Sequence, residues 1–211
     1  MARQTGPVCK LCRREGMKLF LKGERCLSPK CGIEKRNFPP GAQGKRVRFR
    51  QSQSDYAEQL REKQRCRRLY GVYERQFRRY YDMAVAMRGQ TGANLLGLLE
   101  RRFDNIIYRL GLAESRAQAR QLINHGHFVR NEKRLDIPSA LVEAGDVIRV
   151  AERSRDNGYF RGMSEVLEHR SVPTWLSLNA EERGGTVLSL PTREQIELPL
   201  REQLIVEFYS R

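Results

Sequence analysis

The chain has 211 residues, 39% of them hydrophobic, which is enough for two modest folded domains or for one domain with appendages. Its 40 Lys and Arg against 25 Asp and Glu give a formal net charge of +15, which favours a polyanionic partner such as nucleic acid. No apolar run approaches the length of a membrane-spanning helix, and the first residues contain no apolar secretory signal. We therefore expect a cytoplasmic protein without a membrane partner.

The positive charge is concentrated toward the N-terminus. Residues 1–50 contain 14 Lys and Arg against 3 Asp and Glu, whereas residues 151–211 contain 8 against 10. Phosphate would be repelled by such an acidic last quarter. We therefore expect the N-terminal and central regions to contact nucleic acid, and the C-terminal part, with Glu202 and Glu207, to contact protein.

Four cysteines near the N-terminus form two close pairs separated by 13 residues: Cys9, Cys12, Cys26 and Cys31. Two such pairs can supply the four thiolates of a tetrahedral Zn²⁺ site, so the spacing predicts a zinc knuckle that holds one zinc ion. Two disulfides, reduced cysteines without metal, and an iron–sulfur cluster are the alternatives. Basic residues around the cluster can balance its charge and reach phosphate. Those that we expect to contact nucleic acid are Arg3, Lys10, Arg13, Arg14, Lys22, Lys30, Lys35 and Arg36.

Residues 37–54 combine Pro, Gly, Gln and Arg without apolar periodicity, which is typical of a linker. We expect its basic residues to become ordered only against nucleic acid. They are Lys45, Arg46, Arg48 and Arg50.

A block of helices follows the linker. Ser54 or Asp55 can cap a helix over about 55–70, and a second helix is expected over about 73–88, with Gly71 and Gly89 as stop signals. Apolar residues spaced by three and four then predict a third and a fourth helix up to Leu110. Basic residues of the first helix are further candidates for nucleic-acid contact: Arg61, Lys63, Arg67 and Arg68.

Beyond Gly111 the pattern becomes mixed. Ser115 with Gln118 forms a capping box that begins a short helix, and strands are predicted at 128–130 and 147–150. A helix is expected around 164–169 and strand-like segments at 175–178, 186–190 and 204–209. The sequence thus predicts an α+β protein with a small antiparallel sheet.

Residues 101–150, RRFDNIIYRLGLAESRAQARQLINHGHFVRNEKRLDIPSALVEAGDVIRV, resemble the RNA-binding module named after ribosomal protein S-four. The flanking segments GPVCKLCRREGMKLFLKGERC, SDYAEQLREKQRCRRLYGVYERQF and REQLIVEFYSR resemble the zinc-bearing, four-cysteine form of the bacterial S-four family itself. The resemblance implies that basic and polar residues of the module bind RNA. They are Arg116, Gln118, Arg120, Asn124, His125, Lys133 and Arg134.

One position departs from the family pattern. Where the family has glycine in the turn after the first strand of the module, this chain has Glu132. A glutamate tolerates positive φ poorly, so we expect a rearranged turn.

The resemblance implies a structural constituent of the small ribosomal subunit, not an enzyme, that binds a multi-helix junction of small-subunit ribosomal RNA early in assembly. It further implies contacts with ribosomal proteins three and five and with messenger RNA where it enters, an influence on decoding accuracy, and repression of the protein's own messenger. The expected domains are a zinc-binding region with linker (1–45), a helical domain (46–98 with the returning tail 192–211) and an inserted α/β RNA-binding domain (99–191). An RNA-modifying enzyme and a zinc-dependent DNA-binding regulator are the alternatives, but no catalytic motif is present.

Overall fold

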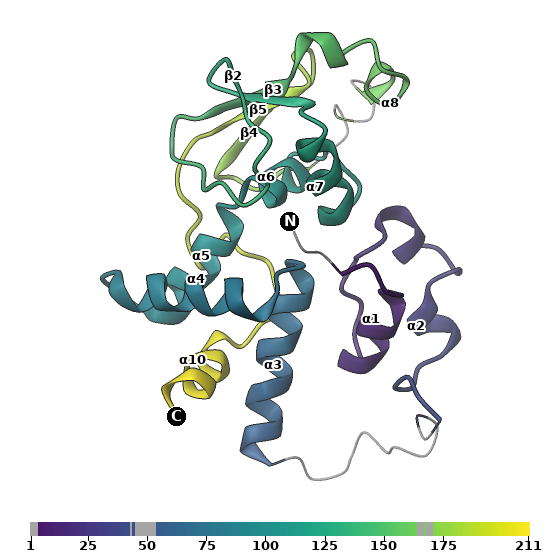
Figure 1. Ribbon diagram of the computed structural model, residues 1–211, viewed down its shortest axis with the longest axis vertical. Coiled ribbons are helices and arrows are strands. Elements are labelled where there is room, and N and C mark those ends of the chain that lie inside the picture. Colours follow the sequence, from purple (N-terminus) through teal and green to yellow (C-terminus); the bar gives the residue numbers. More distant parts are fainter. Residues whose placement is uncertain (1–3, 43, 45–53, 164–166, 168–170) are drawn as a thin grey trace. The chain divides into compact units, whose positions relative to one another are not determined.

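The computed structural model describes residues 4–42, 44, 54–163, 167 and 171–211 (Figure 1). The chain forms two compact units, Met1–Leu95 with Leu198–Arg211, and Leu96–Glu197. The three domains expected from the sequence have other boundaries and stay a prediction. Linker residues 45–53 and most of the helix expected at 164–169 lie outside the described residues. Within the described part, no helix is long and apolar enough to cross a membrane.

The first unit is helical. It contains α1 (Cys9–Glu15), a 3-10 turn (Gly23–Cys26), α2 (Gly32–Lys35), α3 (Asp55–Leu69), α4 (Glu74–Ala86), the start of α5 (Thr91–Glu100) and α10 (Glu202–Ser210). The Ser54 side chain accepts a hydrogen bond from the Ala57 amide and caps α3, which confirms the predicted helix start. The helix expected over about 73–88 is confirmed as α4, which buries Phe77, Tyr80 and Tyr81.

The strand predicted at 204–209 is wrong, because these residues belong to α10, which packs against α3 (Figure 1). Ile205 is fully buried, and Phe208 and Tyr209 follow it at helical spacing. Their rings contact α3 and α4 of the same unit: Phe208 lies 5.7 Å from Tyr56 and Tyr209 lies 4.6 Å from Tyr81, measured between ring centroids. The β-branched pair Ile205-Val206 favours a strand locally, but burial of this helical stripe against α3 decides the structure.

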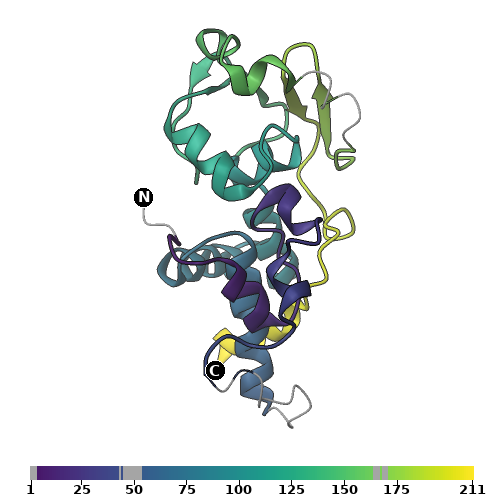
Figure 2. The same cartoon turned by 90° about the vertical axis from the view of Figure 1, so that its right-hand side faces the viewer.

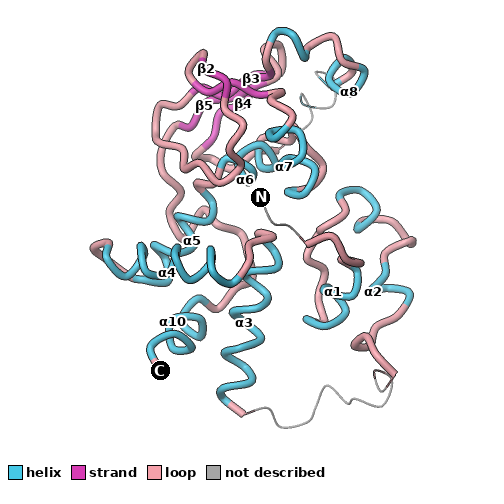
Figure 3. The backbone as a smooth tube through the Cα atoms, in the orientation of Figure 1, coloured by secondary structure: helices cyan, strands magenta, loops and turns pink. Residues whose placement is uncertain are grey.

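The second unit is α+β and is seen from two sides in Figures 1 and 2. After α6 (Phe103–Arg109) and α7 (Arg116–Asn124) come β1 (Phe128–Arg130), β2 (Lys133–Arg134), β3 (Val147–Val150), a 3-10 turn (Glu152–Ser154), α8 (Gly158–Arg161), β4 (Leu176–Asn179) and β5 (Gly184–Val187). The strands form one antiparallel sheet in the order β2-β1-β3-β5-β4, drawn in magenta in Figure 3. The strands predicted at 128–130 and 147–150 are confirmed. The strand predicted at 175–178 is displaced by one residue, and the strand predicted at 186–190 begins two residues and ends three residues earlier.

The core of the second unit lies between the sheet and the helices α6 and α7. Ile106 and Ile107 from α6 and Ile123 from α7 pack there with Phe128 from β1 and Ile148 from β3. The Ser115 side chain accepts a hydrogen bond from the Gln118 amide, so the predicted cap of α7 is confirmed.

The turn between β1 and β2 is not rearranged in the way the sequence suggested. Asn131 and Glu132 take φ values of +48° and +66°, so the glutamate occupies the left-handed backbone conformation that glycine would adopt without strain. The Asn131 side chain holds this conformation, because it donates to Asp146 Oδ1 at 2.8 Å and accepts from the Val147 amide at 2.9 Å. Glu132 forms an ion pair with Arg149.

Candidate nucleic-acid interface and cysteine cluster

The four N-terminal cysteines lie around one small cavity in the first unit. Cys9 and Cys12 lie on α1, Cys26 ends the 3-10 turn and Cys31 precedes α2, and all four line the cavity as free thiols. Burial raises the pKa of the Cys12 thiol, and the three neighbouring thiols raise it further against a hydrogen bond with the Leu19 backbone.

The cavity brings the four thiols together, but not in the arrangement that a bound metal ion requires. Among the described residues, no three His, Cys, Asp or Glu side chains are placed so that they could hold a metal ion. Backbone atoms pack closely around two of the cysteines. A Cβ atom added at Gly32 would lie 2.9 Å from Cys9 Cβ, and the Lys22 amide donates a hydrogen bond to Cys26 Sγ at 3.4 Å. Metal binding would therefore require the thiol groups to move toward a common centre.

A buried carboxylate connects this region to α3. Glu15, at the end of α1, is 7% exposed, and it forms ion pairs with Arg61, at 3.4 Å, and with Arg68. Burial raises the pKa of Glu15 despite these cations, and burial also lowers the pKa of Arg68. Two of the arginines predicted to contact RNA thus stabilise the attachment of α1 to α3.

Lys63 also has an internal role. It is 4% exposed, its Nζ donates to Glu74 Oε1 at 2.8 Å, and it lies 4.6 Å from the centroid of the Phe208 ring on α10. Such a buried cation over an aromatic face stabilises the packing of α3 against α10. Arg67 donates to Gln64 Oε1 through Nε at 3.0 Å and Nη2 at 2.6 Å.

Other predicted contacts in the first unit are open to solvent. The exposed side chains are Lys10, Arg14, Lys22, Lys30, Lys35 and Arg36. Arg13 is half-buried, and it donates to the Phe38 carbonyl at 2.9 Å. Arg3, Lys45, Arg46, Arg48 and Arg50 lie outside the described residues.

Sequence reasoning missed exposed cations on α4. Arg75 and Arg79 lie on the side of the helix opposite the buried Phe77 and Tyr81, and Arg88 follows the helix end, also exposed. The three- and four-residue spacing of apolar residues that predicts α4 also indicates these exposed cations, because the helix face opposite the apolar stripe must be solvated.

In the second unit, the predicted RNA contacts of α7 divide into two groups. Arg116 and Arg120 are only 8% and 6% exposed. Arg120 donates to Asp104 Oδ2 from Nε at 3.0 Å and from Nη2 at 2.6 Å, and Arg116 donates to Asn105 Oδ1 at 2.8 Å. These two arginines join α7 to α6, which is a structural role that their sequence positions do not reveal.

The second group lies at the solvent-facing end of the module. Asn124, His125, Lys133 and Arg134 are exposed, whereas Gln118 is half-buried and accepts a hydrogen bond from the Glu114 amide at 2.9 Å. The adjacent His127 donates to or accepts from Ser154 Oγ at 2.9 Å, and burial, then His125 and Arg153, lower its pKa. These last two causes reflect a local excess of positive charge around the end of α7.

The predicted protein-contact residues lie on α10. Glu207 accepts a hydrogen bond from Gln59 Nε2 at 2.8 Å, and Glu202 lies against Gly92, where an added Cβ would come within 2.7 Å of Glu202 Cγ. Both line a pocket of about 440 Å³ beside the start of α5.

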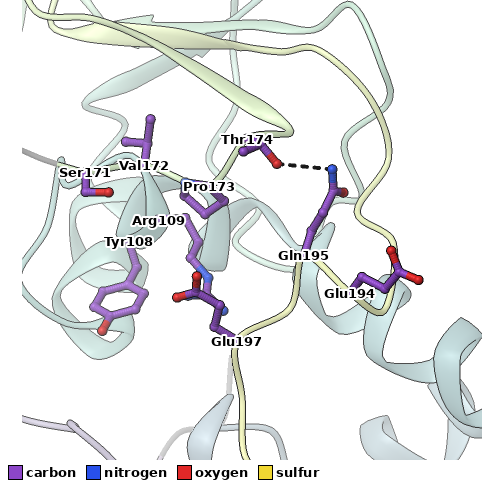
Figure 4. A pocket seen from close by; sticks show the side chains of 9 residues that line it. All are labelled: Tyr108, Arg109, Ser171, Val172, Pro173, Thr174, Glu194, Gln195 and Glu197. Atoms are coloured by element: carbon purple, nitrogen blue, oxygen red, sulfur yellow. Dashed lines mark hydrogen bonds between the residues drawn. The ribbon is translucent and has the colours of Figure 1, made fainter.

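A larger pocket of about 480 Å³ lies in the second unit (Figure 4). It is lined by Tyr108, Arg109, Ser171, Val172, Pro173, Thr174, Glu194, Gln195 and Glu197. The Gln195 side chain donates to Thr174 Oγ1 at 3.2 Å across this pocket (Figure 4). Arg109 forms an ion pair with Glu100 at 2.7 Å, so its positive charge is balanced by that carboxylate. The negative charges of Glu194 and Glu197 therefore make the pocket unfavourable for phosphate.

Comparison with known proteins identifies the class of protein. Residues 3–100 match the family model described as ribosomal protein S4/S9 N-terminal domain, and residues 101–148 match the S4 domain. The chain is 54% identical, over all 211 residues and the full length of each relative, to the small ribosomal subunit proteins uS4 of Halothermothrix orenii, Acetivibrio thermocellus and Thermus thermophilus. The chain belongs to the uS4 family of small ribosomal subunit proteins.

Proposed function

We propose that this chain is a structural component of the small ribosomal subunit that binds ribosomal RNA and performs no catalysis. The observation that carries the proposal is the similarity to uS4 proteins over the whole length of the chain. Family membership also places the chain in the cytoplasm, within the ribosome. The exposed cations of residues 10–36 and those around the end of α7 supply the charge that phosphate contacts require.

The finer roles extend this proposal. The chain binds a multi-helix junction of small-subunit RNA early in assembly, and it contacts ribosomal proteins three and five beside the path by which messenger RNA enters. In that position it influences decoding accuracy, and it represses translation of its own messenger. The acidic balance of residues 171–211, which contain 4 Lys and Arg against 6 Asp and Glu, supports protein contact at the C-terminal end.

Binding of the full chain to purified small-subunit ribosomal RNA tests the proposal, with duplex DNA of equal nucleotide content as the competitor. We expect preference for the folded RNA, and a logarithmic salt slope of roughly −0.7 to −0.9 for each phosphate neutralised. Arg36→Gln should weaken binding, whereas Arg211→Gln, also an exposed cation but in the acidic tail, should not. Equal affinity for both nucleic acids, or no dependence on salt, would contradict RNA recognition.

We also propose that Cys9, Cys12, Cys26 and Cys31 bind one zinc ion that fixes the fold of residues 9–35. The support is that the four free thiols line one cavity beside Lys22 and Arg25, whose charges offset that of four thiolates. Elemental analysis of protein purified without chelator should find about one zinc ion per chain.

Cysteine variants separate this site from the remaining cysteine. Cys26→Ser should release the metal, whereas Cys66→Ala should retain it, because Cys66 is fully buried in α3. Absence of stoichiometric metal would contradict the site, and iron in place of zinc would support the iron–sulfur alternative.

A further inference from the structure

Two arginines share a row on the outer face of the second unit's sheet. Arg134 on β2 and Arg149 on β3 both pair with Val129 on β1, so the three side chains point to the same side. Ile148 and Val150, the neighbours of Arg149, are buried in the core. Because side chains alternate along a strand, Arg149 faces away from the core. The sheet thus presents two guanidinium groups on either side of a small apolar residue.

These side chains line a depression of about 390 Å³. A third arginine, Arg153, follows β3 and donates to the Gly126 carbonyl at 3.1 Å. The full lining is Gly126, Val129, Glu132, Arg134, Arg149, Ala151, Glu152 and Arg153. Because β1 lies between β2 and β3, these two strands are about 10 Å apart, which is twice the spacing of neighbouring strands. Two long arginine side chains that reach over Val129 from opposite sides can span this distance and bind one tetrahedral anion.

The backbone at position 126, beside this depression, favours glycine. An added Cβ would lie 2.4 Å from Nη2 of Arg134, at a backbone φ of +72°. The absence of a side chain at position 126 therefore leaves space that the Arg134 guanidinium uses.

Glu132 is paired with one of these guanidinium groups. Its carboxylate forms an ion pair with Arg149, although 74% of the Glu132 side chain is exposed to solvent. An exposed pair of this kind is weak. A phosphate with more than one guanidinium partner can therefore displace the carboxylate from Arg149.

We propose that this depression is a subsite for a phosphate group of the RNA backbone and that Glu132 competes with the phosphate for Arg149. The inference rests on the proposed RNA-binding function and extends it to Arg149 and Arg153, which sequence reasoning did not select. It also gives Glu132, the departure from the glycine of the family pattern, a defined effect: it lowers the affinity of this face for RNA.

The test measures binding of the full chain to purified small-subunit ribosomal RNA by filter retention at several salt concentrations. Glu132→Gln should raise affinity roughly three- to tenfold and make the logarithmic salt slope steeper by roughly 0.7–0.9. Arg149→Gln should lower affinity and should abolish the gain from Glu132→Gln in the double variant. Glu181→Gln and Arg161→Gln are matched controls, since they change the same charges at exposed positions outside the depression.

The outcomes separate the two proposals. A gain of affinity in Glu132→Gln that depends on Arg149 supports the subsite, because a folding defect cannot produce tighter binding. If the wild-type chain binds the RNA but each variant equals its control, the subsite is wrong and the proposed function stands. If the wild-type chain does not bind the RNA, both are wrong.

Discussion

Asp104 is the residue whose replacement should damage the second unit most. Its carboxylate accepts hydrogen bonds from two arginines, from Arg102 through Nε at 3.0 Å and Nη2 at 2.6 Å, and from Arg120 through Nε at 3.0 Å and Nη2 at 2.6 Å. Arg102 is 0% exposed and Arg120 only 6%. One buried carboxylate thus serves two buried cations.

The charge balance of this triad sets the size of the effect. Asp104→Asn removes the negative charge that Asp104 supplies to two buried guanidinium groups, and breaking a buried ion pair in this way costs about 3–5 kcal/mol of unfolding free energy. Arg120→Met instead leaves the neutral Arg102–Asp104 pair with its two hydrogen bonds intact. That change removes the two Arg120–Asp104 hydrogen bonds but keeps Asp104 paired, so it should cost about 1.5–2 kcal/mol, the low end of the range for hydrogen bonds to a charged group.

Thermal unfolding of the full chain, followed by calorimetry at neutral pH, compares the loss of stability in these two variants. Asp104→Asn should lower the midpoint of the second unit by roughly 10 °C or more and Arg120→Met by a few degrees. Arg120→Met should also keep most of the RNA affinity at temperatures where it is folded. If Asp104→Asn proves no more destabilising than Arg120→Met, or if Arg120→Met loses RNA binding while fully folded, the structural role of the triad is wrong.

Three further changes test other parts of the fold. Ile205→Ala should cost about 2–4 kcal/mol in urea unfolding, because Ile205 is fully buried where α10 packs against α3, whereas Gln203→Ala on the exposed side of α10 should cost little. Glu132→Gly should raise thermal stability by up to about 1 kcal/mol, since it relieves a φ of +66°, and an unchanged or lower midpoint would show that the turn is unstrained. Burial raises the pKa of Asp146, but the Glu143 amide, Arg130 and Asn131 outweigh it, so the pKa lies below its ordinary value of 3.8. The stabilisation from this carboxylate is therefore complete at neutral pH and is lost as pH falls through the lowered pKa, and Asp146→Asn should flatten the acid dependence of unfolding below about pH 4.

Local signals in the sequence predicted most of the regular elements. The capping residues Ser54 and Ser115 mark the starts of α3 and α7, and short apolar runs identify β1 and β3. These signals depend only on neighbouring residues, so they can be read without knowledge of the fold. The error at α10 has the opposite cause, because a short segment with β-branched residues becomes a helix through contacts with α3, which is distant in sequence.

The candidate interface was harder to predict, because the sequence shows which residues are charged but not which charges are already paired. Lys63 is predicted from its charge and Arg116 and Arg120 from the resemblance, yet each is buried against a partner in the fold. Conversely, Arg149 lies within an apolar strand and becomes a candidate only when the pairing of β1 with β2 and β3 places it beside Arg134.

We propose that this chain works as a component of the small ribosomal subunit. Sedimentation of a cell lysate under conditions that separate the two subunits, with the chain quantified in each fraction, tests it most directly. We expect nearly all of the chain in the small-subunit fractions, at a constant ratio to the small-subunit RNA and released only at high salt. A chain found mainly among free soluble proteins, or in the large-subunit fractions, would contradict the account.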